Sequence, residues 1–236
     1  MARPSRGAIS AAPGARHSED FSRISKSGDS SYNFLMTTYR LPLFPLQVVL
    51  LPGQRLPLHI FEERYKTMIG ECIEDDAPFG IVLVGKGGIH KIGCAARITQ
   101  VLEKFPDGRM NILTQGGQRF EVFRVYDSRP YFEGEVGDFH DEEDEDPTEL
   151  CRMVWDALEK SGSAPRNLPD ELLEDPFHLS FAVAEALRLP LREKQAFLGS
   201  RSLEWRLKRL LAFLGKDKPS EFSITDYEKS AHRNGH

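Results

Sequence analysis

The chain contains 236 residues, of which 40% are hydrophobic and 28% are charged, and its formal net charge is −5. This composition is ordinary for a soluble globular protein, and the acidic balance argues against a protein built mainly to bind nucleic-acid phosphates. Cys72, Cys94 and Cys151 lack the close pairing of a metal site, and no apolar run reaches the roughly 20 residues of a membrane span. The sequence therefore predicts a cytoplasmic protein with no metal, cofactor or membrane segment.

Residues 1–36 are rich in Ser, Gly, Ala and Arg and contain few large apolar side chains. Such a segment cannot bury enough surface to offset the entropy lost on ordering, so a disordered N-terminal extension is predicted. The alternative, which is the simpler and favoured interpretation, is that translation begins at Met36, just before the first residues expected to be structured. The rest of the chain divides by composition into a β-rich subdomain (37–139), an acidic linker (140–147), a helical subdomain (148–215) and a polar tail (216–236).

The β-rich subdomain begins with an expected strand over residues 41–46. Because Pro42 and Pro45 have no N–H group for a central ladder, this strand is predicted to lie at a sheet edge. A turn at residues 51–53 and a short strand over residues 55–60 follow. A helix is then predicted over residues 62–74, because apolar residues recur there at helical spacing. The expected buried face consists of Phe61, Tyr65, Met68, Ile69, Cys72 and Ile73.

Further strands are predicted over residues 79–84, 94–105, 110–114, 118–126 and 131–139. Pro106-Asp107-Gly108 is a strong signal for a hairpin between two of them. Six or more short strands around one early helix favour a partly closed β-barrel over a sheet of βαβ units.

The acidic run over residues 138–146 is interpreted as a solvated linker. Asp146-Pro147-Thr148-Glu149 has the cap, proline and acid of a helix start. Helices are also predicted over residues 177–187 and 191–198, with a last leucine-rich helix capped by Ser200 or Ser202. The basic residues of this last region are attributed to the helix dipole; they are Arg201, Arg206, Lys208 and Arg209.

One apparent nucleotide-binding motif occurs, since residues 80–86 match Gly-x-x-x-x-Gly-Lys. The intervening residues are those of a β-strand, Gly87 replaces the hydroxyl residue that binds magnesium, and no helix can open there. We therefore predict a strand followed by a turn. No Gly-x-Ser-x-Gly or His-Glu-x-x-His pattern occurs, and His59 is expected to be an ordinary strand residue.

Residues 41–65, LPLFPLQVVLLPGQRLPLHIFEERY, closely resemble the opening of Lon protease N-terminal (substrate-binding) domains. Weaker matches follow in the family's order at residues 93–98, at the Pro-Asp-Gly hairpin, and at residues 116–122 and 193–195. The resemblance covers about residues 41–214 and is strongest to small bacterial proteins made of this domain alone. It implies an α+β fold: a PUA-like β-pseudobarrel with one early helix, followed by a C-terminal helical bundle.

The resemblance also implies a non-catalytic module that binds unfolded or exposed polypeptide segments in protein quality control. A full Lon protease continues with a Walker motif and a Ser-Lys protease domain, for which this chain has no matching residues. A peptidase label would therefore rest on the family name alone. The alternative function is RNA binding, because PUA-like barrels also occur in RNA-modification systems, although nucleic acid is the less favoured partner. No oligomeric state is predicted.

A protein that binds polypeptide segments needs exposed apolar surface or a free strand edge. Phe44, Phe61 and Tyr65 are candidates to line such a groove, with core packing as the alternative for each. Arg64 and Arg119 are candidates for exposed contacts, with a structural ion pair as the alternative for either. The remaining motif residues are expected to fix turns; they are Pro42, Pro45, Pro52, Gly53, Gly93 and Gly117.

Overall fold

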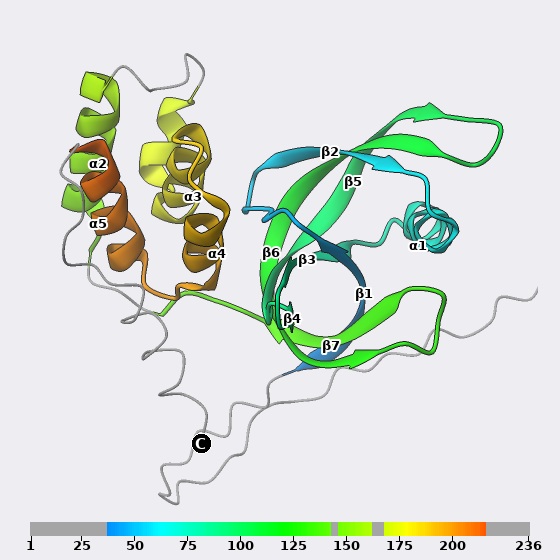
Figure 1. Cartoon of the computed structure of the whole chain (residues 1–236). Helices are drawn as coiled ribbons and strands as arrows, with labels where there is room; N and C mark the ends of the chain where they lie inside the picture. The colour runs from blue at the N-terminus through cyan, green and yellow to red at the C-terminus, as the bar shows by residue number, and fades with distance from the viewer. Residues whose placement is uncertain (1–36, 143–145, 162–167, 216–236) are drawn as a thin grey trace, which may run out of the picture. The chain divides into compact units, whose positions relative to one another are not determined.

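The computed structural model describes residues 37–142, 146–161 and 168–215 (Figure 1). The expected N-terminal extension, the middle of the acidic linker and the polar tail lie outside the described residues. The described strands are β1 (Thr38–Leu46), β2 (Arg55–Ile60), β3 (Phe79–Gly85), β4 (Gly88–Ile89), β5 (Ile92–Lys104), β6 (Met110–Tyr126) and β7 (Phe132–Asp138). The helices are α1 (Glu63–Glu74), α2 (Thr148–Ser161), the short 3₁₀ helix η1 (Asp170–Glu174), α3 (Pro176–Ala186), α4 (Leu191–Gly199) and α5 (Leu203–Leu214). This is the predicted α+β class, with a mostly antiparallel sheet and several helices.

The sheet closes on itself through β1. The strand order is β1-β7-β6-β5-β3, and β1 also pairs in parallel with β3. The prediction that the first strand lies at a sheet edge is therefore wrong. β1 pairs with β7 from Thr38 to Leu43 and with β3 from Leu43 to Leu46, so Pro42 and Pro45 each face a partner strand on one side only. A proline can lie in such a strand when its missing N–H faces the unpaired side.

β6 is a single long strand and replaces the two separate strands predicted over residues 110–114 and 118–126. Its first half pairs with β2 on one side and with β5 on the other. These strands form a three-stranded extension of the barrel, which we call the arm: β2, residues 98–104 of β5 and residues 110–115 of β6 (Figure 1).

Close backbone approaches at the base of the arm explain the motif glycines there. A Cβ atom on Gly116 would lie 2.2 Å from the carbonyl oxygen of Leu51, so no side chain fits. Gly53 has φ +77° and donates its N–H to the carbonyl of Gly116 at 2.9 Å. A Cβ atom on Gly117 would meet only the Ala95 carbonyl at 3.7 Å, which is an ordinary contact. Of this glycine pair, Gly116 is therefore the position with no space for a side chain, whereas the structural glycine predicted from the sequence is Gly117.

The ring of Phe120 fills the interior of the barrel. A Cβ atom on Gly80 would lie 2.6 Å from the ring's Cζ atom, and one on Gly93 would lie 2.5 Å from it. Both positions lack a side chain because the ring occupies that space. The surrounding apolar cluster consists of Leu41, Leu43, Val82, Phe120, Val122 and Val136.

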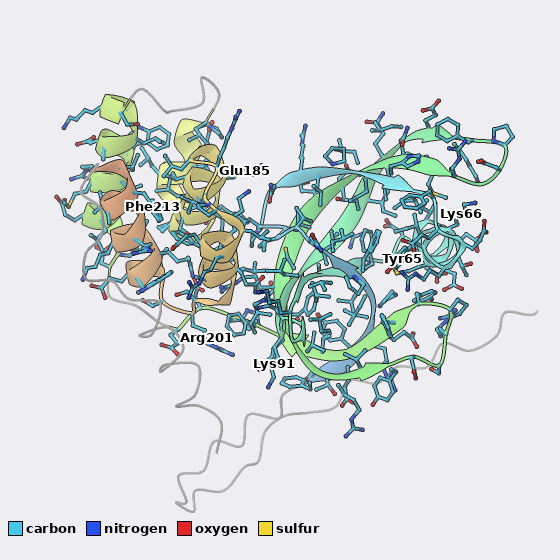
Figure 2. The ribbon with its side chains drawn as sticks, viewed as in Figure 1. Tyr65, Lys66, Lys91, Glu185, Arg201 and Phe213 are labelled. Atoms are coloured by element: carbon cyan, nitrogen blue, oxygen red, sulfur yellow. The ribbon has the colours of Figure 1, made fainter. Side chains whose placement is uncertain are left out.

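Helix α1 packs beside the arm and ends near the turn between β6 and β7 (Figure 1). It buries Tyr65, Met68, Ile69 and Cys72, as its periodicity predicts. Phe61 and Ile73, which the same pattern places on the buried face, are 59% and 41% exposed. Lys66 follows Tyr65 in the helix (Figure 2). Its Nζ donates to the carbonyl oxygen of Asp107 at 2.9 Å and links the helix to the hairpin turn.

The helices after the barrel share one buried apolar cluster with the strands. Within that cluster α5 packs against α2 and α3, and α3 packs against α4. The predicted cap of the last helix is confirmed, because Ser202 Oγ accepts the backbone N–H of Trp205 at 3.1 Å.

Two fully buried arginines and one carboxylate join the barrel to the helices. Arg119 of β6 and Arg206 of α5 have no exposed side-chain surface, and both bind the carboxylate of Asp141. Arg206 Nη1 and Nη2 donate to the two Asp141 oxygens at 2.9 and 2.5 Å. Arg119 also donates to the backbone carbonyls of Leu198 (3.0 Å) and Ser200 (2.6 Å).

This network corrects two sequence interpretations. Asp141 lies in the run interpreted as a solvated linker, yet its side chain is only 18% exposed and its carboxylate is shared by two cations. Arg206 is a buried partner of that carboxylate near the start of α5 and does not complement the helix dipole. Burial lowers the pKa of Arg119 to about 10 and Asp141 opposes this shift, so the guanidinium remains charged at neutral pH.

Replacing Asp141 by Asn should destabilise the fold strongly. The change keeps the side-chain shape but leaves two buried guanidinium groups without a counter-charge, which typically costs about 3–5 kcal/mol. Urea unfolding followed by the fluorescence of Trp155 and Trp205 would measure the change. Glu142→Gln is the matched control, since Glu142 is an exposed neighbouring carboxylate, and it should shift the free energy of unfolding by no more than about 0.5 kcal/mol. Equal effects of the two substitutions would contradict the structural role of Asp141.

Candidate functional site

Two of the aromatic candidates belong to the core. Phe44 and Tyr65 are each 6% exposed, and their ring centroids are 4.1 Å apart. Burial raises the pKa of the Tyr65 hydroxyl, and the nearby Arg64 partly opposes this. Both aromatic residues are therefore packed in the core, which was the alternative predicted for them, and neither is exposed to a ligand.

The two arginine candidates differ in exposure. Arg119 is 1% exposed and forms an ion pair with Asp141. Of the two alternatives predicted for it, the structure shows the structural ion pair and not an exposed contact. Arg64 is 45% exposed and forms an ion pair with Glu62 at 2.8 Å. Its guanidinium also lies over the Tyr65 ring at 4.5 Å. Arg64 therefore remains on the surface at the start of α1.

Phe61 is the aromatic candidate that the structure leaves exposed. Its ring stacks on His59 with centroids 5.9 Å apart, and His59 meets the edge of Phe105 at 6.3 Å. His59 Nδ1 lies 2.6 Å from Asn111 Oδ1. Asn111 Nδ2 donates a hydrogen bond to Glu103 Oε2 at 2.9 Å. These polar side chains form a row across the three strands of the arm.

The same face of the arm has a shallow hollow of about 510 Å³, which we call the outer hollow. It crosses all three strands of the arm, and Leu102, which is 50% exposed, stands at its β5 side. Its lining residues are Pro57, Leu58, His59, Leu102, Glu103, Asn111 and Ile112.

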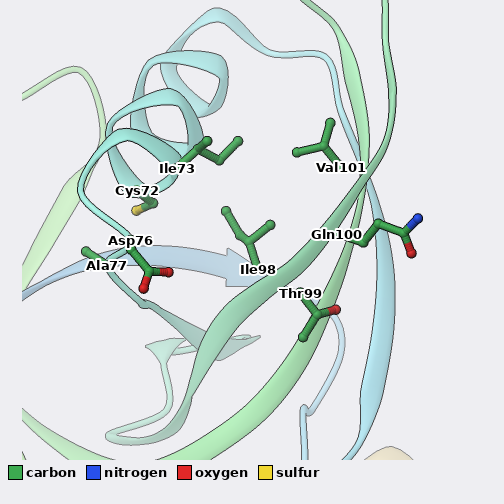
Figure 3. Close-up of a pocket in the computed structure, with 8 residues that line it drawn as sticks. All are labelled: Cys72, Ile73, Asp76, Ala77, Ile98, Thr99, Gln100 and Val101. Carbon is green, nitrogen blue, oxygen red and sulfur yellow. The ribbon is translucent and has the colours of Figure 1, made fainter.

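A second hollow of about 200 Å³ lies between β5 and the C-terminal end of α1, and we call it the inner groove (Figure 3). Ile98 and Val101 of β5 face Ile73 and Cys72 of the helix across it. The remaining lining residues are Asp76, Ala77, Thr99 and Gln100. The two hollows therefore adjoin the same stretch of β5.

Sequence reasoning missed the apolar residues at this strand. Val101 and Leu102 are exposed although they lie in a predicted strand, and Ile73 was assigned to a buried face. The ladder between β5 and β6 shifts register between Ile98 and Gln100 and again between Val101 and Glu103. Such bulges break the alternation that would otherwise indicate which side chains are exposed, and the sequence has no local signal for them.

The described residues hold no cluster of three or more His, Cys, Asp or Glu side chains able to bind a metal ion. No helix in the described part of the chain is both long and apolar enough to cross a membrane. The three cysteines are all buried. Burial raises the pKa of the Cys72 thiol to about 11 and that of Cys94 to about 12, and it also raises the pKa of Cys151.

Known proteins resemble this chain across most of its length. The family model of the ATP-dependent protease La (LON) substrate-binding domain matches residues 40–216. A crystal structure of a Lon N-terminal domain protein from Xanthomonas campestris is 28% identical, with a TM-score of 0.57, over 74% of this chain and 98% of that one. The N-terminal domain of the Mycobacterium avium complex Lon protease is 16% identical and matches the fold with a TM-score of 0.58, over 76% of this chain and 100% of that one.

Full-length Lon proteases are also similar to it. Lon protease 2 of Herpetosiphon aurantiacus and the Lon protease of Rhizobium meliloti are 30% and 29% identical over 77% and 80% of this chain. The match covers only 24% and 25% of their own sequences, so the chain spans about a quarter of the length of these relatives. Because the family model covers well over half of its residues, the chain belongs to the family of Lon substrate-binding domains.

Proposed function

We propose that this protein binds unfolded or exposed polypeptide segments through the apolar surface around the arm and α1. The observation that carries the proposal is the gathering of exposed apolar side chains at two adjoining hollows. Leu102 lines the outer hollow, and Phe61 stacks on His59, which also lines it. Ile73 and Val101 line the inner groove. Exposed apolar surface of this kind marks interaction sites, and the family model describes a substrate-binding domain.

The chemistry of the two hollows favours polypeptide over other ligands. Both are shallow, whereas sites for small molecules enclose most of the ligand and direct a few polar groups at it. RNA binding would require cationic side chains beside stacking platforms. The charged side chains that line the hollows are the carboxylates of Glu103 and Asp76 instead, and they would repel a phosphate backbone.

We extend the proposal to a role in protein quality control in the cytoplasm, because misfolded proteins expose the apolar segments that this surface would bind. The role is non-catalytic. The raised pKa values of the three thiols disfavour the nucleophilic thiolate.

Replacing both Phe61 and Leu102 by Ser should weaken binding of an unfolded polypeptide about tenfold, since buried apolar anchors dominate such interfaces. The measurement is fluorescence anisotropy with a labelled protein that is kept unfolded by reduction and alkylation. The control replaces Met153 of α2 and Leu191 of α4 by Ser, because these apolar side chains are 47% and 41% exposed elsewhere on the surface. The control variant should bind as the unmodified chain does.

Three other outcomes would contradict the proposal. The unmodified chain could fail to bind the unfolded probe at low salt, or both double variants could lose affinity equally. The third outcome is measured by titrating labelled RNA in parallel. Tight RNA binding that falls steeply with rising salt would favour the RNA-binding alternative.

The thiols provide an independent test of the non-catalytic role. In the native protein at pH 8, a thiol reagent such as Ellman's reagent should modify Cys72, Cys94 and Cys151 only slowly, because all three are buried and their pKa values are raised. All should react at once after unfolding in guanidinium chloride. Rapid stoichiometric modification of one native thiol would indicate an activated cysteine and would argue for a catalytic site.

A further inference from the structure

One edge of β5 is open along the arm. β5 pairs with β3 only from Phe79↔Ala96 to Ile81↔Cys94, whereas its pairing with β6 continues as far as Lys104. Among the residues that the structure describes, no strand pairs with β5 beyond Ala96 on the β3 side. The N–H and C=O groups that point away from β6 are therefore available to another extended chain.

The inner groove runs beside this open edge. Ile98, Thr99, Gln100 and Val101 contribute its strand side, and the end of α1 forms its other wall (Figure 3). A volume of about 200 Å³ has room for side chains but not for an α-helix, whose diameter is about 10–12 Å. An extended segment at the edge would direct alternate side chains into this groove and toward the opposite face, where Leu102 is exposed.

The charges beside the groove favour a basic partner. α1 ends in Glu74, followed by Asp75 and Asp76, and its last turn contains no basic residue. These carboxylates stand at the negative end of the helix dipole, where they reinforce its field. Arg97 offsets part of this charge through its 3.3 Å contact with Asp76, whose carboxylate is nevertheless 90% exposed.

We propose that the free edge of β5 binds an extended polypeptide segment as an added strand. The segment alternates apolar and polar residues and carries lysine or arginine at the end that lies beside the C-terminus of α1. The two bulges in β5 limit regular pairing to a few residues, so binding depends on the side chains in the inner groove as well as on the backbone. The inference rests on the proposed polypeptide-binding function and specifies the conformation and charge of its ligand.

A pair of backbone-methylated peptides would test strand addition. The probe is a short capped peptide of alternating valine and threonine with lysines at one end, prepared with lysines at either terminus, and its affinity for the full chain is measured by anisotropy. N-methylation of every second residue removes the hydrogen-bond donors along one edge of the peptide, and methylation of the intervening residues removes those along the other. One pattern should weaken binding about tenfold and the other should leave it nearly unchanged. Equal effects of both patterns would overturn strand addition.

Charge recognition is tested by changing Glu74→Gln, Asp75→Asn and Asp76→Asn together. Asn suits position 76, whose φ is +47°. The triple variant should bind the lysine peptide about tenfold more weakly at low salt and should bind an uncharged version of it as well as the unmodified chain does. The control neutralises the exposed carboxylates Glu149, Asp156 and Glu159 of α2, which is an equal change in net charge. Unchanged affinity of the triple variant for the lysine peptide would overturn the basic preference.

The outcomes separate this inference from the function on which it rests. If the unfolded protein binds through Phe61 and Leu102 while both methylated peptides behave alike, the polypeptide-binding function holds and strand addition fails. If no unfolded polypeptide binds, the function itself fails. A self-associated form that joins β5 edges and excludes the peptide would also overturn the inference, because the edge would then serve a second copy of this chain.

Discussion

The fold depends on one carboxylate shared by two buried guanidinium groups. Burying a charge is costly unless the charge is paired and hydrogen-bonded. Most donors of the two arginines meet this condition, while Arg119 Nε has no hydrogen-bond partner among the described residues. Asp141 supplies both of its oxygens, the carbonyls of Leu198 and Ser200 accept from the arginines, and Arg206 Nε donates to Ser180 Oγ at 3.0 Å. These partners come from β6, the segment after β7, and the last three helices. The network therefore connects the barrel to the helices.

That arrangement decides which predicted binding residues are available to a ligand. Arg119 is paired with Asp141, and Phe44 and Tyr65 are buried in the core beneath α1, so none of the three is available to a ligand. Beside the two hollows, the exposed apolar residues are instead Phe61, Ile73, Val101 and Leu102. Phe61 stays exposed because it precedes α1 and stacks on His59, outside the face that the helix buries.

Local patterns predicted the elements well, while long-range pairing could not be inferred. The periodicity of α1, the Pro-Asp-Gly turn and the cap at Ser202 depend on residues close in sequence, and each is found in the structure. The closure of the barrel through β1 depends on β3 and β7, which no local signal specifies. The predicted strands left out residues 115–117, whereas β6 continues through Gly116. The close approach of Gly116 to Leu51 involves a distant segment and has no local signal. Asp141 is likewise indistinguishable, by sequence alone, from the solvated acids around it.

The exposed edge of β5 raises a physical problem, since an open, apolar strand edge normally promotes aggregation. Two features of the arm counter this. The bulges at Thr99 and Leu102 interrupt the ladder and increase the local twist, so a long flat strand cannot continue along it. The carboxylates at the end of α1 also repel an identical edge from a second molecule, because both copies would bring the same negative charge. Selectivity for a short basic segment and protection from self-association thus have the same physical origin.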